Sequence, residues 1–201
     1  MHVAHERRFH QTGQGPARAT SGRGTGRRMM SDIVVRPARP EDTERVLAYL
    51  DEILREPHSN LLSDPEEFAR RFPPDRERAF IEQVAASDTS LFLIAEEGDE
   101  IVGQLTLLGS ERKALRHTAT LGISVRRDRR NRGIGRRLMT EAIAWARDRS
   151  TLRRIELNVF VRNEPAVHLY RSLGFEIEGR RRRSIYKDGE YIDDFIMALL
   201  L

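Results

Sequence analysis

The chain has 201 residues, a formal net charge of +4 and no cysteine, and 39% of its residues are hydrophobic. This length predicts one domain, alone or with a tail, and the hydrophobic content is sufficient for a core. The lack of cysteine excludes disulfides, thiol nucleophiles and cysteine-based zinc sites, so a reducing cytoplasm is the expected location.

The first 30 residues differ from the rest in composition. They are rich in Gly, Arg, Thr and Gln without apolar periodicity, so a disordered basic tail is expected, followed by one domain over residues 31–201. The tail is interpreted as a basic arm or, preferably, as a leader upstream of a natural start at Met29 or Met30. Its six arginines and one glutamate leave the remaining residues at −1, so no nucleic-acid partner is expected. No secretion signal and no membrane partner are expected either.

Apolar patterns in the first half predict one strand followed by two helical regions. The β-branched run at 33–37 predicts the strand, and Pro40 opens a helix that ends at the Pro-His-Ser-Asn break of 57–60. A second helical region covers about 65–85 and is divided by Pro73-Pro74.

The middle of the chain has the pattern of three strands. Residues 91–95 form a continuous apolar run, which predicts a central strand buried on both faces. A turn at 97–100 and a second apolar segment at 101–108 predict a hairpin. Residues 116–126 alternate between apolar and polar and predict the next strand.

A single parallel crossover is expected after that strand. The apolar stripe of 133–149 predicts a helix, and the alternation of 155–161 predicts the strand that follows it. A shorter helix is predicted over 164–173, with Asn163 as N-cap. Strands are predicted around 175–186 and 191–200, joined by a hairpin turn at Asp188-Gly189.

The turn before helix 133–149 has the composition of an anion site. A strand, a Gly-rich turn and a helix N-terminus leave backbone N–H groups free for a negative ligand. The surrounding arginines are Arg126, Arg127, Arg129, Arg130, Arg132, Arg136 and Arg137. A bound phosphate or pyrophosphate is therefore predicted, and the alternative is an arginine-rich surface turn with a glycine N-cap.

Two familiar phosphate loops do not fit this turn. A Walker A loop needs Gly-Lys-Ser/Thr, and a dinucleotide fingerprint needs a glycine where Leu138 stands. The pattern Arg/Gln-x-x-Gly-x-Gly/Ala does fit, from Arg130 to Gly135. A second pattern, Asn-x-x-Ala-x-x-Leu-Tyr-x-x-x-Gly-Phe, runs from Asn163 to Phe175. In these two motifs the chain resembles the GNAT (GCN5-related N-acetyltransferase) family, over about residues 33–200.

The resemblance implies an α/β fold with acetyl-CoA as co-substrate and no metal. Its central sheet is mixed and mostly antiparallel, with helices on both faces in the order β-α-α-β-β-β-α-β-α-β-β, which agrees with the elements predicted above. A homodimer is common in the family and is expected only on that ground.

The resemblance also implies where coenzyme A binds. The pyrophosphate would lie on the turn at 130–136, and the amide-rich pantetheine arm would pair with the strand at 121–125. The implied cofactor-binding residues are Ile123, Ser124, Val125, Arg130, Asn131, Arg132, Gly133, Ile134, Gly135, Arg136, Asn158, Asn163 and Tyr170.

Three residues are catalytic candidates. The backbone N–H of Val125 would stabilise the oxyanion, and the Tyr170 phenol would protonate the leaving thiolate. Tyr170 also fits the apolar face of its helix, where a core tyrosine would lie. Many relatives place a glutamate on the strand before the loop, but this chain has Thr120-Leu121-Gly122-Ile123-Ser124. Glu156 is the candidate base, and a relay of backbone and water is the alternative.

Other polar residues carry weaker indications. His58, Glu67, Glu77 and Glu82 are candidates for acceptor contacts but are more simply interpreted as solvated side chains. The six histidines have no ligand spacing for a metal. The arginine run 180–183 is interpreted as the solvated edge of a strand, or as a group that attracts an acidic acceptor.

The favoured function is transfer of an acetyl group from acetyl-CoA to a primary amine by direct attack in a ternary complex. A small amine or amino acid is the first acceptor class and a protein N-terminus the second. The alternative is a regulatory module that binds acyl-CoA without catalysis, and retention of Tyr170 argues against it.

Overall fold

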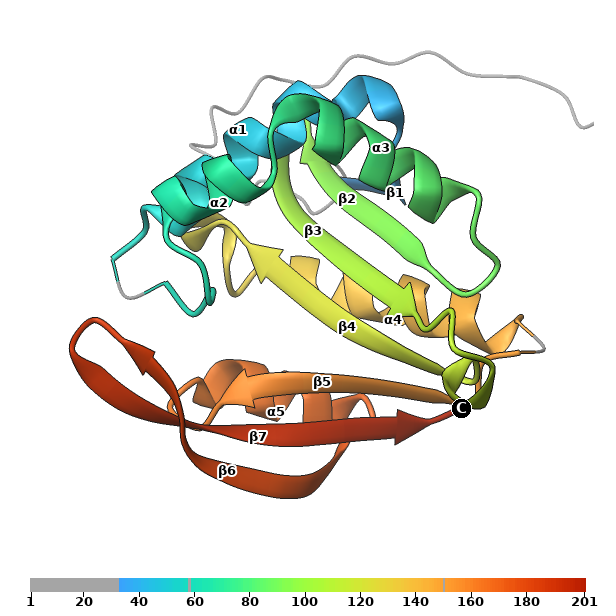
Figure 1. Ribbon diagram of the computed structural model, residues 1–201, viewed down its shortest axis with the longest axis vertical. Coiled ribbons are helices and arrows are strands. Elements are labelled where there is room, and N and C mark those ends of the chain that lie inside the picture. Colours follow the sequence, from blue (N-terminus) through green and yellow to red (C-terminus); the bar gives the residue numbers. More distant parts are fainter. Residues whose placement is uncertain (1–32, 58, 150) are drawn as a thin grey trace, which may run out of the picture.

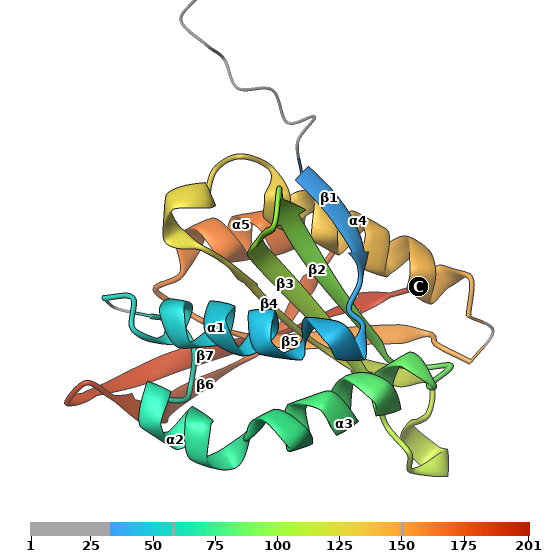
Figure 2. The ribbon, with the colours of Figure 1, turned by 90° about the horizontal axis from the view of Figure 1, so that it is seen from above.

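A mixed β-sheet covered by helices on both faces forms the framework (Figure 1, Figure 2). The structure, a computed structural model, describes residues 33–57, 59–149 and 151–201. The expected basic tail and His58 lie outside the described residues. The seven strands follow the order β1-β2-β3-β4-β5-β7-β6.

The bounds of the elements agree closely with the apolar patterns. The strands are β1 Ile33–Pro37, β2 Leu91–Glu97, β3 Glu100–Gly109, β4 Thr118–Val125, β5 Arg154–Phe160, β6 Glu176–Lys187 and β7 Glu190–Leu200. The helices are α1 Thr43–Leu54, α2 Pro65–Arg71, α3 Pro74–Ala85, α4 Ile134–Arg147 and α5 Glu164–Ser172. The α/β class and the mixed, mostly antiparallel sheet are confirmed, since β4 and β5 are the only parallel pair among the described strands.

The second helical region is interrupted where Pro73-Pro74 was expected to divide it. Pro74 opens α3 in the first turn, where the missing proline N–H leaves no hydrogen bond unmade. The N-cap Asp64 of α2 accepts a hydrogen bond from the Glu67 backbone N–H at 2.7 Å. The N-termini of α2 and α3 are therefore each determined by residues close by in the sequence.

Two hydrophobic cores lie on opposite faces of the sheet. The larger one joins α4 and α5 to β2, β3, β4, β5 and β7, with Leu138, Met139, Ile155 and Met197 fully buried. The smaller one joins α1 and α3 to the other face of β2 and includes Val46, Ile81 and Ile94. Alternate residues of β2 enter each core, which explains why its sequence is apolar without a break.

The sheet opens between β4 and β5. These strands pair only at Thr118–Thr120 with Arg154–Glu156. Beyond Thr120 they diverge, and Figure 1 shows the gap widening toward the end where α5 begins. The divergence leaves one backbone edge of β4 without a neighbouring strand in the middle of the sheet.

The last two strands form a long, irregular hairpin. Asp188 and Gly189 have φ of 52° and 81°, which is the geometry of the expected tight turn. Farther along, the register shifts between Arg181 and Ile185, and Arg183 has φ of 51°. This bulge places extra residues of β6 opposite one residue of β7 and bends the strand locally.

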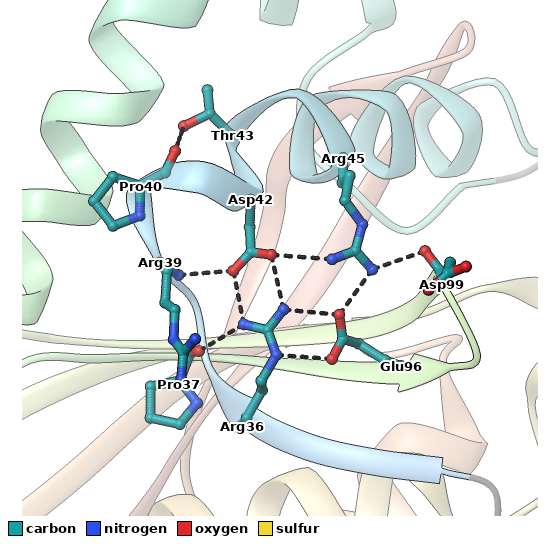
Figure 3. A network of polar contacts seen from close by, with 9 residues as sticks. All are labelled: Arg36, Pro37, Arg39, Pro40, Asp42, Thr43, Arg45, Glu96 and Asp99. Atoms are coloured by element: carbon teal, nitrogen blue, oxygen red, sulfur yellow. Dashed lines mark hydrogen bonds and ion pairs between the residues drawn. The ribbon is translucent and has the colours of Figure 1, made fainter.

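An ion-pair network fastens β1 to α1 at the far edge of the sheet (Figure 3). Arg36 lies between two carboxylates and donates to both oxygens of Asp42, at 2.7 and 2.8 Å, and to both oxygens of Glu96, at 2.8 Å each. Arg45 donates to the same two carboxylates at 3.0 and 2.7 Å. Asp42 and Thr43 therefore begin α1 in a fixed position relative to the sheet.

None of the helices in the described residues is both long enough and apolar enough to cross a membrane.

Candidate active site

A cavity of about 1350 Å³ fills the space where β4 and β5 diverge. Its walls come from α1 and the loop that follows it, β4, the start of α4, β5, α5 and the β6–β7 hairpin. It is larger than a typical small-ligand pocket of about 300–1000 Å³. Its volume is sufficient for one long ligand and one smaller ligand at the same time.

The backbone of β4 presents unpaired groups to this cavity. The Arg126 N–H donates to the Val102 carbonyl at 3.0 Å, so the alternation of an antiparallel ladder turns the backbone groups of Val125 and Ile123 away from β3. They face β5, which has already diverged. An extended chain of amides can therefore pair with β4 here as an additional strand would.

The turn before α4 supplies a helix N-terminus to the same cavity. Asn131 and Gly133 have φ of 61° and 80°, and these are residue types that accept left-handed backbone. Gly133 is the N-cap and provides no side-chain hydrogen bond, so the first N–H groups of α4 have no partner within the helix. The first turn also contains no acidic residue. These features suit a phosphate or pyrophosphate.

Most of the residues expected to bind coenzyme A line this cavity. They are Ile123, Ser124, Val125, Arg130, Asn131, Gly133, Ile134, Gly135, Arg136, Asn158, Asn163 and Tyr170. Arg132 is exposed and does not line it. The two motifs are separated in the sequence, and the fold brings them to one cavity because α4 and α5 lie on the same face of the sheet.

Arg130 is held in place by a residue that the sequence did not indicate. Its Nε donates to the Val125 carbonyl at 2.9 Å, and its Nη2 bonds the Glu56 carboxylate. Glu56 also accepts from the Arg127 backbone N–H at 2.7 Å. The Glu56 carboxylate, just beyond the end of α1, therefore contacts two residues of the turn. Because Glu56 is far from the turn in the sequence, no local pattern predicts these contacts.

Tyr170 is buried at the edge of the cavity, with 7% of its surface exposed. Its ring lies 5.9 Å from the ring of Phe175, and its hydroxyl has no hydrogen-bond partner among the described residues. Burial raises the pKa of Tyr170 to about 12. The phenol therefore keeps its proton at neutral pH and can donate it to a group in the cavity.

A second tyrosine lies behind β4. The buried Tyr49 hydroxyl is 3.0 Å from the Ser124 hydroxyl, so the Ser124 side chain points toward α1. Burial raises the pKa of Tyr49 above its ordinary value, although the Ser124 hydrogen bond opposes this effect. Tyr49 is one of the buried residues of α1, and no sequence motif distinguishes it from a core residue.

The two asparagines of the site differ in their role in the fold. Asn163 starts α5 as expected, and its backbone carbonyl accepts from Ala166 and Val167 at 3.1 Å each. Asn163 is therefore the N-cap that was expected, although its side chain makes no capping hydrogen bond. Asn158 is exposed on β5. Both amides are thus available to a ligand in the cavity.

Glu156 is not brought to the cavity. It lies at the last paired position of β4 and β5, before the strands diverge, and does not line the cavity. Its carboxylate is 3.4 Å from both Nε and Nη2 of Arg154. Glu156, the expected base, therefore lies where β4 and β5 are still paired and not in the cavity.

The acidic residues considered for the acceptor side also lie outside the lining. Glu67 and Glu82 do not line the cavity, and Glu77 is buried with 4% exposed, which corrects its interpretation as a solvated side chain. Burial raises the pKa of Glu77 above its ordinary value. The residues that do line this side are mostly apolar: Leu50, Ile53, Leu54, Leu61, Leu62 and Phe68.

Comparison with known proteins gives concordant matches. The profile of the Acetyltransferase (GNAT) family matches residues 47–175, which is more than half of the chain. The chain is 33% identical over 171 residues to the L-amino acid N-acetyltransferase AaaT of Escherichia coli (strain K12), covering 84% of this chain and 98% of that protein.

Solved structures agree with these matches. A crystal structure of a GNAT-family acetyltransferase from Streptococcus pneumoniae has a TM-score of 0.80 at 32% identity, covering 84% of this chain and 99% of that one. The structure of yncA from Salmonella typhimurium with its cofactor acetyl-CoA shares the fold, with a TM-score of 0.73 at 20% identity over 85% and 94% of the two chains. With the profile match, the identity to AaaT and this fold, the chain belongs to the GNAT family of acetyltransferases.

Proposed function

We propose that this acetyltransferase moves the acetyl group of acetyl-CoA to the primary amine of a small molecule, by direct attack while both substrates are bound. The observation that carries the proposal is the divergence of β4 and β5. It places the free backbone groups of Ile123, the free N–H of Val125, the uncapped start of α4 and Tyr170 around one cavity. The acetyl-CoA bound in the yncA structure supports the same donor.

The residues that line the cavity are chemically suited to the parts of acetyl-CoA. The N–H groups at the start of α4 and the guanidinium groups of Arg130 and Arg136 suit the pyrophosphate. The free backbone N–H and carbonyl of Ile123 suit the pantetheine amides. When bound, acetyl-CoA supplies the activated acyl group as a thioester.

Two groups of the protein would act on the reacting atoms. The Val125 N–H can donate to the thioester carbonyl oxygen as this oxygen gains negative charge. As the nitrogen–carbon bond forms and the sulfur–carbon bond breaks, the Tyr170 phenol can give its proton to the thiolate. Because burial raises the pKa of Tyr170 to about 12, this acid form persists across the physiological range.

Removal of the proton from the acceptor is assigned to water. Asp194 is the only carboxylate among the described residues that line the cavity. Burial acts to raise the pKa of Asp194, but the hydrogen bonds from Arg181 and Ser184 outweigh it and hold the pKa below its ordinary value. Asp194 is therefore a weak base, and the water relay replaces the earlier candidate Glu156.

The test is free-thiol release from acetyl-CoA with the full chain and a panel of amino acids, polyamines and N-terminal peptides. Turnover confined to amino acids or other small amines supports the proposal, and turnover confined to peptides favours a protein N-terminus instead. Silence across the panel, with acetyl-CoA binding detected by calorimetry, would favour an acyl-CoA-binding module without catalysis.

A further inference from the structure

A fixed arginine forms part of the cavity wall on the β6–β7 hairpin. The Arg181 Nε donates to Asp194 Oδ1 at 3.0 Å, and its Nη2 bonds Asp194 Oδ2. The Ser184 hydroxyl donates to the same Oδ1 at 2.5 Å. Asp194 is completely buried, whereas the Arg181 side chain is 48% exposed. A buried carboxylate thus orients a guanidinium whose Nη1 has no hydrogen bond to the described residues.

The bulge in β6 creates this arrangement. Arg181 lies directly opposite Asp194, and the register then shifts until Ile185 pairs with Ile192. Because of the extra residues, the Ser184 hydroxyl also lies within hydrogen-bond distance of the Asp194 carboxylate. Two side chains of β6, Arg181 and Ser184, therefore donate to one carboxylate of β7. A regular ladder would place only the directly opposite pair together, and bulges commonly redirect side chains beside functional sites.

This group lies on the side of the cavity that faces away from the core around α4 and α5. Phe195 packs against that core, so its neighbour Asp194 points to the other face of the sheet, as does its β5 partner Phe160. The apolar residues of α1 and the following loop line the same cavity. Figure 1 and Figure 2 show the hairpin and the loop between α1 and α2 at the same end of the molecule. The start of α4 and Tyr170 belong to the opposite side.

The charges that line the cavity offer no partner to a cation on this side. Asp194 is the single carboxylate among the described residues of the lining, and Arg181 already matches it. Arg129, Arg130 and Arg162 also line the cavity and pair with carboxylates outside the lining. A polyamine would bring several positive charges into this cavity without a free carboxylate to meet them. A carboxylate would meet an oriented guanidinium, which binds planar oxyanions through paired N–H groups.

We propose that Arg181, oriented by the buried Asp194 and by Ser184, binds the carboxylate of the acceptor. The acceptor is then a free amino acid, or another small amine that carries a carboxylate near its amino group. This inference rests on the proposed function and narrows its substrate class, because a polyamine and an amine without a carboxylate make no use of Arg181.

The experiment compares each amino acid with its carboxamide, which keeps the amine and the side chain but lacks the negative charge. Amino acids with apolar side chains are used because the facing wall is apolar, and rates are expressed per concentration of unprotonated amine. With Arg181→Met, kcat/KM for the amino acid is expected to fall about 10- to 100-fold, the size of a hydrogen bond to a charged group. The value for the carboxamide should not change.

Arg180→Met is the matched control. Arg180 is the adjacent arginine, also pairs with an aspartate, at 2.7 Å from Asp193, and does not line the cavity. It should leave both acceptors unaffected. If Arg181→Met fails to fold because Asp194 is left unpaired, the double variant Arg181→Met with Asp194→Asn removes that charge and should show the same selective loss. Equal loss on both acceptors, or no loss on either, overturns the proposal.

Binding separates this inference from the proposed function. Titration of the amino acid into wild-type protein saturated with CoA needs no turnover. Heat of binding in the wild type that disappears in Arg181→Met supports the carboxylate site even if no thiol is released. No binding of the amino acid alongside turnover of polyamines would overturn the site and leave the acetyltransferase activity established.

Discussion

At the scale of single residues, Tyr170 combines two properties that usually compete. Its ring is packed against Phe175 as a core residue would be, yet the surface that remains belongs to the cavity. Its hydroxyl receives no hydrogen bond from the described residues, so the raised pKa has burial as its cause. The packing fixes the position of the phenol, and the absence of a protein partner leaves its proton for the substrate.

Tyr170→Phe should therefore separate binding from catalysis. Because phenylalanine fills the same space without the hydroxyl, the Kd for acetyl-CoA should stay unchanged, while kcat should fall by about 10²-fold or more, as expected when a general acid is lost. Stopped-flow thiol release and calorimetry on the same protein measure the two quantities.

Tyr186→Phe provides the control for this change. Tyr186 is 67% exposed at the hairpin and contacts Tyr191 with tilted rings, whose centroids are 4.9 Å apart. Loss of its hydroxyl should leave kcat unaltered. A Tyr170→Phe enzyme with wild-type kcat would show that another group, or water, protonates the thiolate.

Residue identity alone predicted part of this site. The Arg-x-x-Gly-x-Gly turn and the Asn163–Phe175 motif are local, and most of their defining residues line the cavity, although Gly174 and Phe175 do not. Glu156 could not be judged from its polar strand position, because whether it reaches the cavity depends on where β4 and β5 stop pairing. Glu56 and Arg130 are 74 residues apart, and only the fold shows that they meet.

At the scale of elements, the hairpin also fastens the loop that covers the apolar side of the cavity. The Lys187 ammonium donates to the backbone carbonyls of Ser59 and Leu61, at 2.9 and 2.6 Å. These bonds tie the tip of the hairpin to the segment between α1 and α2. The cavity wall formed by Leu61 and Leu62 therefore depends on a contact between distant parts of the chain.

Lys187→Met should loosen this wall. The loop loses two charged hydrogen bonds, so kcat/KM for the acceptor should fall on the order of tenfold, equivalent to about 1.4 kcal/mol. Because the proposed acetyl-CoA site is formed by β4 and the start of α4, the KM for acetyl-CoA should not change. Initial rates at varied concentrations of each substrate test this split, with the exposed Lys113→Met as control. A matching rise in both KM values would point to general destabilisation instead.

Element boundaries were largely available from local chemistry. Alternation identified β4 and β5, the paired prolines divided α2 from α3, and Asp-Gly marked the hairpin turn. The bulge between Arg181 and Ile185 was not predicted, because four consecutive arginines look the same in a regular edge strand as in a shifted one. What distinguishes them is the buried carboxylate on the neighbouring strand.

At the scale of the whole molecule, the network around Arg36 holds the edge of the sheet far from the cavity. Arg36 and Arg45 share the carboxylates of Asp42 and Glu96, with 7% and 12% of those side chains exposed. The Arg36 hydrogen bond holds the pKa of Asp42 below its ordinary value. Burial acts to raise the pKa of Glu96, but the bonds from Arg36 and Arg45 outweigh it and lower the pKa.

Asp42→Asn should cost about 2 kcal/mol of unfolding free energy, because the partly exposed guanidinium groups of Arg36 and Arg45 lose a buried charged partner. Since folding lowers both pKa values, the network stabilises fully above the unfolded pKa values of about 3.9 and 4.3, and that contribution is lost as pH falls through the lower folded values. The wild type should therefore lose more stability between pH 5 and pH 2 than the variant. Urea denaturation at the two pH values measures this.

Asp51→Asn serves as the control for the network. Asp51 forms an exposed pair with Arg55 one helical turn away, and its loss should cost less than about 0.5 kcal/mol. Activity should be retained in both variants, because none of the residues in the network lines the cavity. If Asp42→Asn were as stable as Asp51→Asn, the network would be as weak as an ordinary surface pair.

The divergence of β4 from β5 also gives this strand two kinds of amide. Gly122 and Ser124 donate toward β3, whereas Ile123 and Val125 face the side without a strand. In hydrogen exchange followed by NMR, neighbouring amides along β4 should thus alternate between slow and fast in the free protein. Acetyl-CoA should slow exchange only at the fast amides of Ile123 and Val125. Ligand binding at the open edge of β4 could then be followed residue by residue.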